Sequence, residues 1–207
     1  MKLILLGIFV LLSVATVIGQ TALTKEEYGI YSVVLRGFER DVRRERKDPL
    51  PLKFLILSKT GIRESTDAWP SRGSVYQSFR NRNKTQADIE TKFSLNFAYT
   101  VAEESEILGL IEKETLRFEA EQERRRKENL PADGSECGPG WGKPFFERFP
   151  KTDFYVRLSK IGFSRDHRWA VLELQATGEE SDFHMSYLMK WNAGWKIYEA
   201  AGSFGVC

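Results

Sequence analysis

Histidine and cysteine are scarce in this chain of 207 residues, which holds two of each. The two histidines are His167 and His184, and no cysteine, aspartate or glutamate lies around them at the spacing of a zinc motif. Zinc sites take three or four such ligands, usually at short intervals in the sequence. The sequence therefore predicts no metal site, either structural or catalytic.

A strong charge of one sign is also missing, because the formal net charge of the chain is only +2. Nucleic acids and anionic lipid surfaces attract proteins through a large basic excess. Basic residues gather in segments 40–47, 80–84 and 124–127, but the first and the last end predicted helices, where basic residues complement the helix dipole. We therefore expect no nucleic acid among the partners of this protein.

Sequence motifs of the common catalytic and nucleotide-binding sites are absent as well. There is no Gly-x-Ser-x-Gly turn for a nucleophilic serine and no glycine-rich loop for phosphate groups. We expect no cofactor, and no residue stands out as catalytic. Whether the protein is an enzyme stays open, and the missing motifs favour a protein that is not one.

One long apolar run is present at the N-terminus, where residues 3–14 follow a single lysine. The run is short for a bilayer span, and small residues precede position 20, as signal peptidase requires. We interpret residues 1–19 as a signal peptide cleaved before Gln20, which makes the protein secreted or periplasmic without a stable membrane span. The alternative is an uncleaved anchor, because residues 3–18 nearly span a thin membrane.

The two cysteines are Cys137, in a turn-rich segment, and Cys207, the last residue. In an oxidising compartment the simplest arrangement is a disulfide between them, which would tie the C-terminus to a loop. Closing a loop of about 70 residues stabilises a fold by roughly 4 kcal/mol in the chain-entropy model. The alternatives are two free thiols or a catalytic thiol at Cys137, although the sequence places no histidine beside it.

The first half of the chain is predicted from capping signals and from the spacing of apolar residues. Thr24 and Glu27 form a capping box ahead of apolar residues at three- and four-residue steps, which predicts a helix that ends before Pro49. The other predicted segments are a buried strand at 52–57, mostly loop with one helical turn at 62–84, a short helix at 85–92 and a half-buried strand at 93–101.

The second half predicts a long helix followed by a β-meander. Ser105 is the expected helix cap and Asn129 the expected end, and Gly109 leaves open whether the segment is one helix or two. The meander strands are expected near residues 154–163, 168–176, 183–191 and 195–201, with a bulge near Ser159 and Lys160. Residues 20–207 are therefore expected to form one α+β domain, with helices packed on a curved antiparallel sheet and a C-terminal four-stranded meander.

A set of residues between positions 141 and 198 resembles a group of uncharacterised secreted bacterial proteins. The shared pattern is Trp141, Phe145, Phe146 and Phe149-Pro150, then Leu158-Ser159-Lys160-Ile161-Gly162-Phe163, then a final hairpin with Gly194-Trp195. The resemblance implies export and a fold but no activity, and it makes the aromatic residues structural and buried. A weaker similarity to nuclear transport factor 2-like proteins implies a cone-shaped sheet covered by helices.

Two functions of different classes remain. The first is a non-enzymatic binding or accessory domain of the cell envelope or extracellular space, which binds a partner through exposed sheet or basic helix ends. The second is a pocket for a small molecule or a reaction, with Glu173, Tyr187 and Glu199 as its polar groups. His167 is expected in a turn and His184 on a solvated strand face. We expect the first function.

Overall fold

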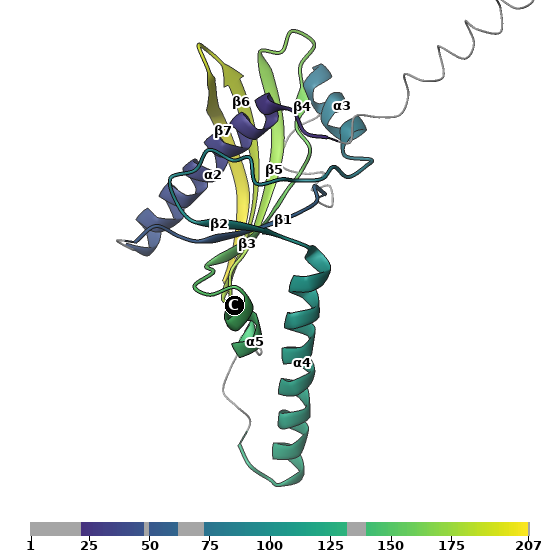
Figure 1. Ribbon diagram of the computed structural model, residues 1–207, viewed down its shortest axis with the longest axis vertical. Helices are drawn as coiled ribbons and strands as arrows, with labels where there is room; N and C mark the ends of the chain where they lie inside the picture. Colours follow the sequence, from purple (N-terminus) through teal and green to yellow (C-terminus); the bar gives the residue numbers. More distant parts are fainter. Residues whose placement is uncertain (1–21, 48–49, 62–72, 132–139, 207) are drawn as a thin grey trace, which may run out of the picture.

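A mixed sheet of seven strands forms the centre of the protein, and the described helices pack around it (Figure 1). The computed structural model describes residues 22–47, 50–61, 73–131 and 140–206. Residues 1–19 and both cysteines lie outside these segments, so signal cleavage and the disulfide stay predictions. The elements are α2 (Lys25–Arg46), β1 (Phe54–Leu57), α3 (Gly73–Arg82), β2 (Tyr99–Ala102), α4 (Glu104–Lys127), α5 (Gly142–Arg148), β3 (Phe154–Leu158), β4 (Gly162–Phe163), β5 (Trp169–Thr177), β6 (Ser181–Trp191) and β7 (Trp195–Val206).

The strands follow the order β2-β1-β3-β5-β6-β7, and β4 also pairs with β5. β1 is parallel to β2 and to β3, whereas the pairs from β3 to β7 are antiparallel. The predicted α+β class and C-terminal meander are confirmed, and the sheet as a whole is mixed. Its parallel part arises because long crossovers, one with α3 and one with α4 and α5, return the chain to the same end of the sheet. In Figure 1, β1 and β2 run across the view and β5 to β7 along it, so the sheet is strongly twisted.

Helix α2 covers one side of the sheet, which we call face A. Its N-terminus is the predicted capping box, because the Glu27 N–H donates to Thr24 Oγ1 at 3.2 Å and the Thr24 N–H donates to Glu27 Oε2 at 2.8 Å. Its apolar side packs on β1, β3, β5 and β6 to form the main core. The buried apolar residues of α2 are Tyr28, Ile30, Tyr31, Val34, Leu35, Phe38 and Val42.

The opposite side, face B, is covered by α3 at one end and by α4 and α5 at the other (Figure 1). In α3, Tyr76 and Phe79 pack on Val171 of β5. A Cβ atom at Gly162 would lie only 2.4 Å from the Phe79 nitrogen, so this close approach of α3 to β4 requires glycine. The helical turn predicted within residues 62–84, from Val75, Tyr76 and Phe79, lies inside α3, but the prediction of mostly loop around it is wrong. Contacts with β4 and β5 stabilise a helix of 10 residues, longer than the local pattern indicates.

Residues 85–92 form no helix, contrary to the prediction from Thr85 and Asp88. Asp88 instead forms isolated β-bridges with Ala22 and Lys59. Bridges to distant parts of the chain therefore take the place of the local hydrogen bonds that a helix would make.

The predicted strand 93–101 is a strand only in its last part, where β2 begins at Tyr99. Before β2 the chain is irregular, and its two phenylalanines pack on face A. The Phe93 ring lies 5.3 Å from a tyrosine ring of α2, and the Phe97 ring lies 4.9 Å from a phenylalanine ring of β1, measured between centroids. The alternation of apolar and polar residues therefore indicates only that one side of the segment is buried. An irregular segment can have such a buried side as well as a strand.

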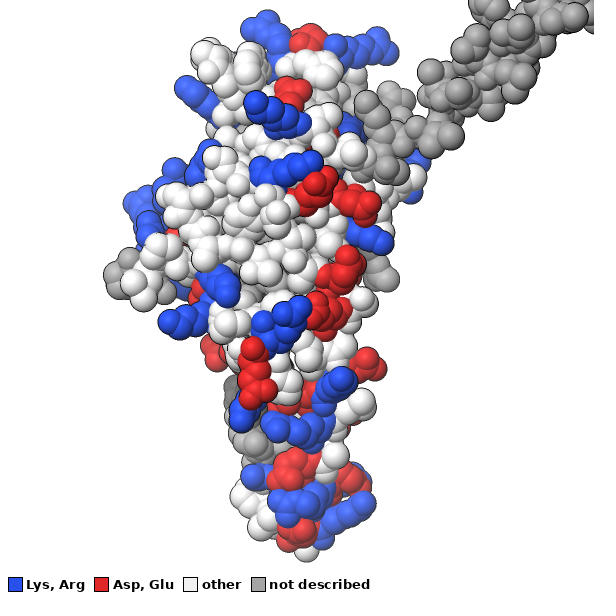
Figure 2. All heavy atoms as spheres, viewed as in Figure 1, with Lys and Arg blue, Asp and Glu red and all other residues white. Residues whose placement is uncertain are grey.

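Helix α4 is a single helix of 24 residues that extends beyond the end of the sheet (Figure 1). Gly109 does not interrupt it, and its N-cap is Glu103 and not Ser105. Figure 2 shows positive and negative side chains interspersed along its outer half. None of the helices in the described segments has the length and apolar character of a membrane span. The aromatic residues at α5 are buried against α4 and β1, as predicted: Trp141, Phe145 and Phe149.

The meander contains the predicted bulge. Leu158 of β3 is opposite Leu174, and Gly162 of β4 is opposite Val171, so four steps along this part of the chain match three steps along β5. Ser159 lies inside the bulge, where its N–H and its Oγ both bond to the backbone of β5, at 3.0 and 2.8 Å. The extra residue shifts the register and turns the following side chains, including that of Lys160.

Candidate anion-binding site

The three residues predicted to line a pocket do not come together in the fold. Glu173 of β5 lies on face B and is 2 % exposed, whereas Tyr187 of β6 lies on face A and is 4 % exposed. Glu199 is exposed on β7, the last strand of the sheet. Burial raises the pKa of the Tyr187 hydroxyl, and the negative charge of Asp41 raises it further. Because Glu173 and Tyr187 are on opposite sides of the sheet, one pocket does not include both.

Glu173 lies close to a histidine that the sequence did not link to it. The Nε2 atom of His184 is 3.7 Å from Glu173 Oε2, and the His184 side chain is 30 % exposed, so only part of it is solvated. Burial lowers the pKa of His184, which favours the neutral imidazole. Ser186, the cross-strand neighbour of Glu173, is also buried. This group is enclosed in the sheet and offers a ligand little contact beyond the imidazole edge.

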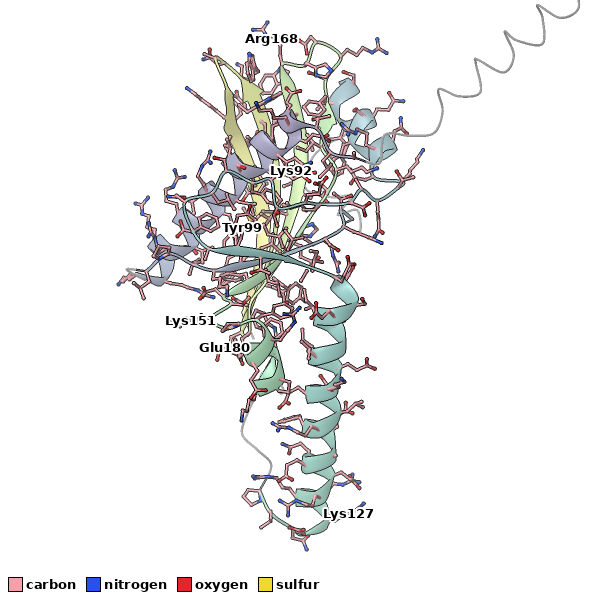
Figure 3. All side chains as sticks on the ribbon, in the orientation of Figure 1. Lys92, Tyr99, Lys127, Lys151, Arg168 and Glu180 are labelled. Carbon is pink, nitrogen blue, oxygen red and sulfur yellow. The ribbon has the colours of Figure 1, made fainter. Side chains whose placement is uncertain are left out.

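A more open site lies where the start of α2 meets the end of α3 and the β3–β4 bulge. It is a cleft of about 370 Å³, which we call the Lys160 cleft. Arg168, labelled at the top of Figure 3, directly follows the lining residue His167 and marks this end of the molecule. Phe163 is the one apolar residue among the described lining residues, and the others are polar or charged: Thr24, Glu26, Glu27, Asn81, Arg82, Thr85, Lys160 and His167.

One wall of the Lys160 cleft is an ion pair between α2 and α3. Arg82 Nη2 donates to Glu27 Oε1 at 2.7 Å, and Glu27 Oε2 accepts the Thr24 N–H of the capping box. Both carboxylate oxygens are therefore bonded, and Glu27 is 1 % exposed. The Arg82 side chain is 34 % exposed and also lies over the Phe163 ring, 5.7 Å from its centroid. Its guanidinium keeps further N–H groups with which it can bind a ligand.

The other wall carries Lys160, which the bulge turns toward the cleft. Lys160 is 5 % exposed, and its Nζ donates to Thr85 Oγ1 at 2.8 Å. Among the described residues, no carboxylate lies within 4.0 Å of this ammonium. Burial lowers the pKa of Lys160, the charge of Arg82 lowers it further, and Glu27 opposes them. A largely buried lysine whose ammonium has no carboxylate partner within 4.0 Å among the described residues is stabilised when an anion binds in the cleft beside it.

The backbone of Lys160 is fixed by one side chain at the end of α3. Asn83 Nδ2 donates to the Lys160 carbonyl at 3.0 Å, and Asn83 Oδ1 accepts the Lys160 N–H at 2.7 Å. The same Nδ2 donates to the Phe79 carbonyl at 2.9 Å. Asn83 and Thr85 thus hold the lysine at both its backbone and its ammonium, which keeps the charge in one place.

Two stacked rings form the rim of the Lys160 cleft. The rings of Phe163 and His167 are 5.2 Å apart between centroids and 17° from parallel. His167 is exposed in the predicted turn, where its N–H donates to the Ser164 carbonyl at 3.0 Å and its φ is +52°. The turn prediction is confirmed, and the rim adds a flat aromatic surface beside the two cations.

No known protein family, curated protein or solved structure matches this chain. The resemblance to secreted bacterial proteins and to nuclear transport factor 2-like sheets therefore stays a prediction. The described residues also contain no group of three or more histidine, cysteine, aspartate or glutamate side chains that could hold a metal ion. Function must be inferred from the chemistry of the site itself.

Sequence reasoning missed the Lys160 cleft because its members are far apart in the chain. Arg82 is 55 residues from Glu27, and Lys160 is 75 residues from Thr85. One signal was present, namely a lysine among the apolar residues of a predicted strand, at the predicted bulge. An ammonium, a guanidinium and hydroxyl groups around one cleft suit a carboxylate or phosphate group.

Proposed function

We propose that this protein is an exported, non-enzymatic binding domain that holds a small anionic group, a carboxylate or a phosphate, between Arg82 and Lys160. The observation that carries the proposal is Lys160, a largely buried lysine that lines a cleft and whose ammonium has a hydroxyl group as its hydrogen-bond acceptor among the described residues. Export is supported by the signal-like pattern of residues 1–19. The protein would act in the cell envelope or the extracellular space.

The arrangement of the described lining residues favours binding over catalysis. The Glu27 carboxylate has both oxygens engaged and is buried, so it is poorly placed to act as a general base. His167 is exposed and its ring is stacked on Phe163, whereas the Thr85 hydroxyl is engaged by the Lys160 ammonium. The other carboxylate of the lining, Glu26, accepts the Trp195 Nε1–H at 3.0 Å, so the fixed donors of Arg82 and Lys160 favour holding an anion over transforming it.

Titration with inorganic phosphate and with acetate, at constant ionic strength, tests the proposal. In ¹H–¹⁵N spectra we expect saturable shifts at the amides of Arg82, Thr85 and Lys160. The Lys160→Met substitution should weaken phosphate binding at least tenfold, which corresponds to about 1.4 kcal/mol. Lys84→Met is the matched control, because Lys84 is an exposed lysine outside the lining and should leave the affinity unchanged.

A folded Lys160→Met protein is expected, because methionine fills a similar volume without a buried charge. Its melting temperature in the absence of anions should equal or exceed that of the parent protein. Shifts that never saturate, or an equal loss of affinity in Lys84→Met, would show only general attraction to a basic surface and would contradict the site. Export is tested separately, by the intact mass of the protein outside the cytoplasm, which should begin at Gln20.

A further inference from the structure

A second and larger cavity, of about 660 Å³, lies at the far end of the sheet from the Lys160 cleft. It is bounded by the end of α2, by α5 and by the start of β6. Glu180, which lines it, is labelled beside α5 in Figure 3, well away from Arg168. Its volume falls within the roughly 300–1,000 Å³ that ligand pockets occupy. We call it the acidic cavity.

Aromatic rings form one side of the acidic cavity. Phe183 of β6 is cross-strand partner to Phe204 of β7, and their ring centroids are 4.6 Å apart. Phe204 is 57 % exposed, although it is a large apolar residue in a regular strand. An exposed ring that is tilted against a buried one is a surface on which an apolar or cationic side chain can pack.

The charges around the acidic cavity are mostly negative. Glu45, Glu179 and Glu180 line it, are exposed, and have no ion pair within 4.0 Å among the described residues. The one basic lining residue, Arg46, donates to Ser181 Oγ at 3.1 Å and lies over an aromatic ring at 4.7 Å. The cavity therefore presents unneutralised carboxylates beside aromatic rings, a combination that complements a cation.

The acidic cavity adjoins an unprotected edge of the sheet. β7 is 12 residues long and is the last strand of the sheet among the described segments. Within the described segments, no backbone hydrogen bond joins the outer edge of β7 to another part of the chain. Residues 200–205 include no charged residue and no proline, which are the usual means of blocking an edge strand.

We propose that an extended, basic segment of another protein adds to the outer edge of β7 along residues 200–205 and places a lysine or arginine in the acidic cavity. Side chains of neighbouring strands lie about 5 Å apart, so a residue paired beside Phe204 reaches both its ring and the cavity. Every second residue of such a segment points to the same side, at intervals of about 7 Å. Main-chain pairing supplies affinity, and the carboxylates select for positive charge. This partner site is independent of the Lys160 cleft.

The test uses the full chain and a short fluorescent peptide of alternating lysine and valine. We expect saturable binding, with a dissociation constant that rises about tenfold in the double variant Glu179→Gln, Glu180→Gln. Glu199→Gln is the matched control, because Glu199 is an exposed glutamate of β7 that does not line the cavity, and it should change the constant less than twofold. All three sites are exposed, so the variants should keep the circular dichroism spectrum of the parent.

Two altered peptides separate the parts of the proposal. A peptide with glutamate in place of lysine should bind at least tenfold more weakly, and equal binding would overturn the role of the carboxylates. A peptide with N-methyl groups on alternate amides cannot complete strand pairing, so undiminished binding would overturn edge addition.

Two further outcomes would assign the site to another occupant. Binding of N-acetyl-arginine amide as tightly as the peptide would point to a small organic cation instead. A concentration-dependent dimer that excludes the peptide would assign the edge to a second copy and end the proposal.

Discussion

Helices α2 and α4 have similar lengths and the same order of charges, yet they occupy opposite environments. Each has glutamates in its first turn and arginines in its last, with 22 residues in α2 and 24 in α4. Eleven residues of α2 are buried, whereas only Ile107 and Glu114 of α4 are. A charge order that complements the helix dipole therefore stabilises a helix without deciding where it lies. The apolar stripe decides that, and α4 lacks one along its outer half.

The largest effect that separates the two helices should come from a leucine in each. Leu35 of α2 is fully buried in the main core, so Leu35→Ala should lower the free energy of unfolding by about 3 kcal/mol through lost burial and a cavity. Leu116 of α4 is 59 % exposed, so Leu116→Ala should change it by less than about 0.5 kcal/mol. Urea unfolding followed by tryptophan fluorescence measures both. Equal losses would mean that α4 is packed on a partner in solution.

Substitutions at the N-termini of α2 and α4 should change the free energy of unfolding by a smaller amount than the leucine substitutions. Thr24→Ala removes a side-chain cap on the Glu27 amide and should cost about 1 kcal/mol. Ser105→Ala is the counterpart, and it should cost nothing measurable because the N-cap of α4 is Glu103, which makes no side-chain cap, and Ser105 lies inside the helix. Chemical denaturation of the two variants side by side gives the comparison. If Ser105→Ala lowered the free energy of unfolding as much as Thr24→Ala, Ser105 would be the N-cap of α4, as the sequence predicts.

A glycine-to-alanine substitution should stabilise α4 but not α2. Nothing lies within 4 Å of a Cβ built on Gly109 of α4, so Gly109→Ala should raise stability by about 0.5–1 kcal/mol through helix propensity. At Gly37 of α2 the added methyl would lie 2.9 Å from Ile197 Cδ1, so the gain should be cancelled by the shift of that side chain. Thermal unfolding of the two alanine variants tests the contrast. A stabilised Gly37→Ala protein would show that β7 yields more easily than its packing suggests.

The parts of the fold that the sequence predicts correctly are those held by local signals. The capping box of α2 and the alternation in β5 and β6 act over a few residues, and both are confirmed. The bulge at Ser159 also has a local signal, a change in the parity of the apolar residues. The sequence predicts only one turn of α3, because Phe79 packs against Gly162 of β4, 83 residues further along the chain, and nothing near it in sequence indicates that contact.

The candidate sites depend even more on contacts between distant parts of the chain than the helices and strands do. The sequence predicts Glu173 and Tyr187 in one pocket because both are polar residues of the meander strands, but the pleat places them on opposite faces. The Lys160 cleft joins α2, α3 and the bulge, so it exists only after three distant segments have packed together. A site made from side chains so far apart is a product of tertiary structure, and sequence spacing carries little trace of it.

The smallest effect concerns the charged outer half of α4, where ion pairs replace core contacts. Glu121 accepts hydrogen bonds from Arg124 at 2.7 and 2.9 Å and from Arg125 at 3.0 Å. These bonds lower the pKa of Glu121 to about 2, Arg124 being the larger cause. The pKa of Glu121 in the folded protein lies below the ordinary value of 4.5. The stabilisation of this part of α4 by the ionised Glu121 is therefore complete above pH 4.5 and is lost as the pH falls through about 2.

Carbon-detected NMR of the Glu121 carboxyl group measures this directly. The midpoint should lie near pH 2 and rise toward 4.5 in the Arg124→Gln variant, while the urea midpoint of the core stays unchanged. In α2, by contrast, the Glu27–Arg82 pair is a tertiary contact with a buried carboxylate, so Arg82→Gln should lower the urea midpoint. If both arginine variants lowered that midpoint equally, the outer half of α4 would be part of the cooperative core, because only a helix packed on the body transmits a lost ion pair to the rest of the protein.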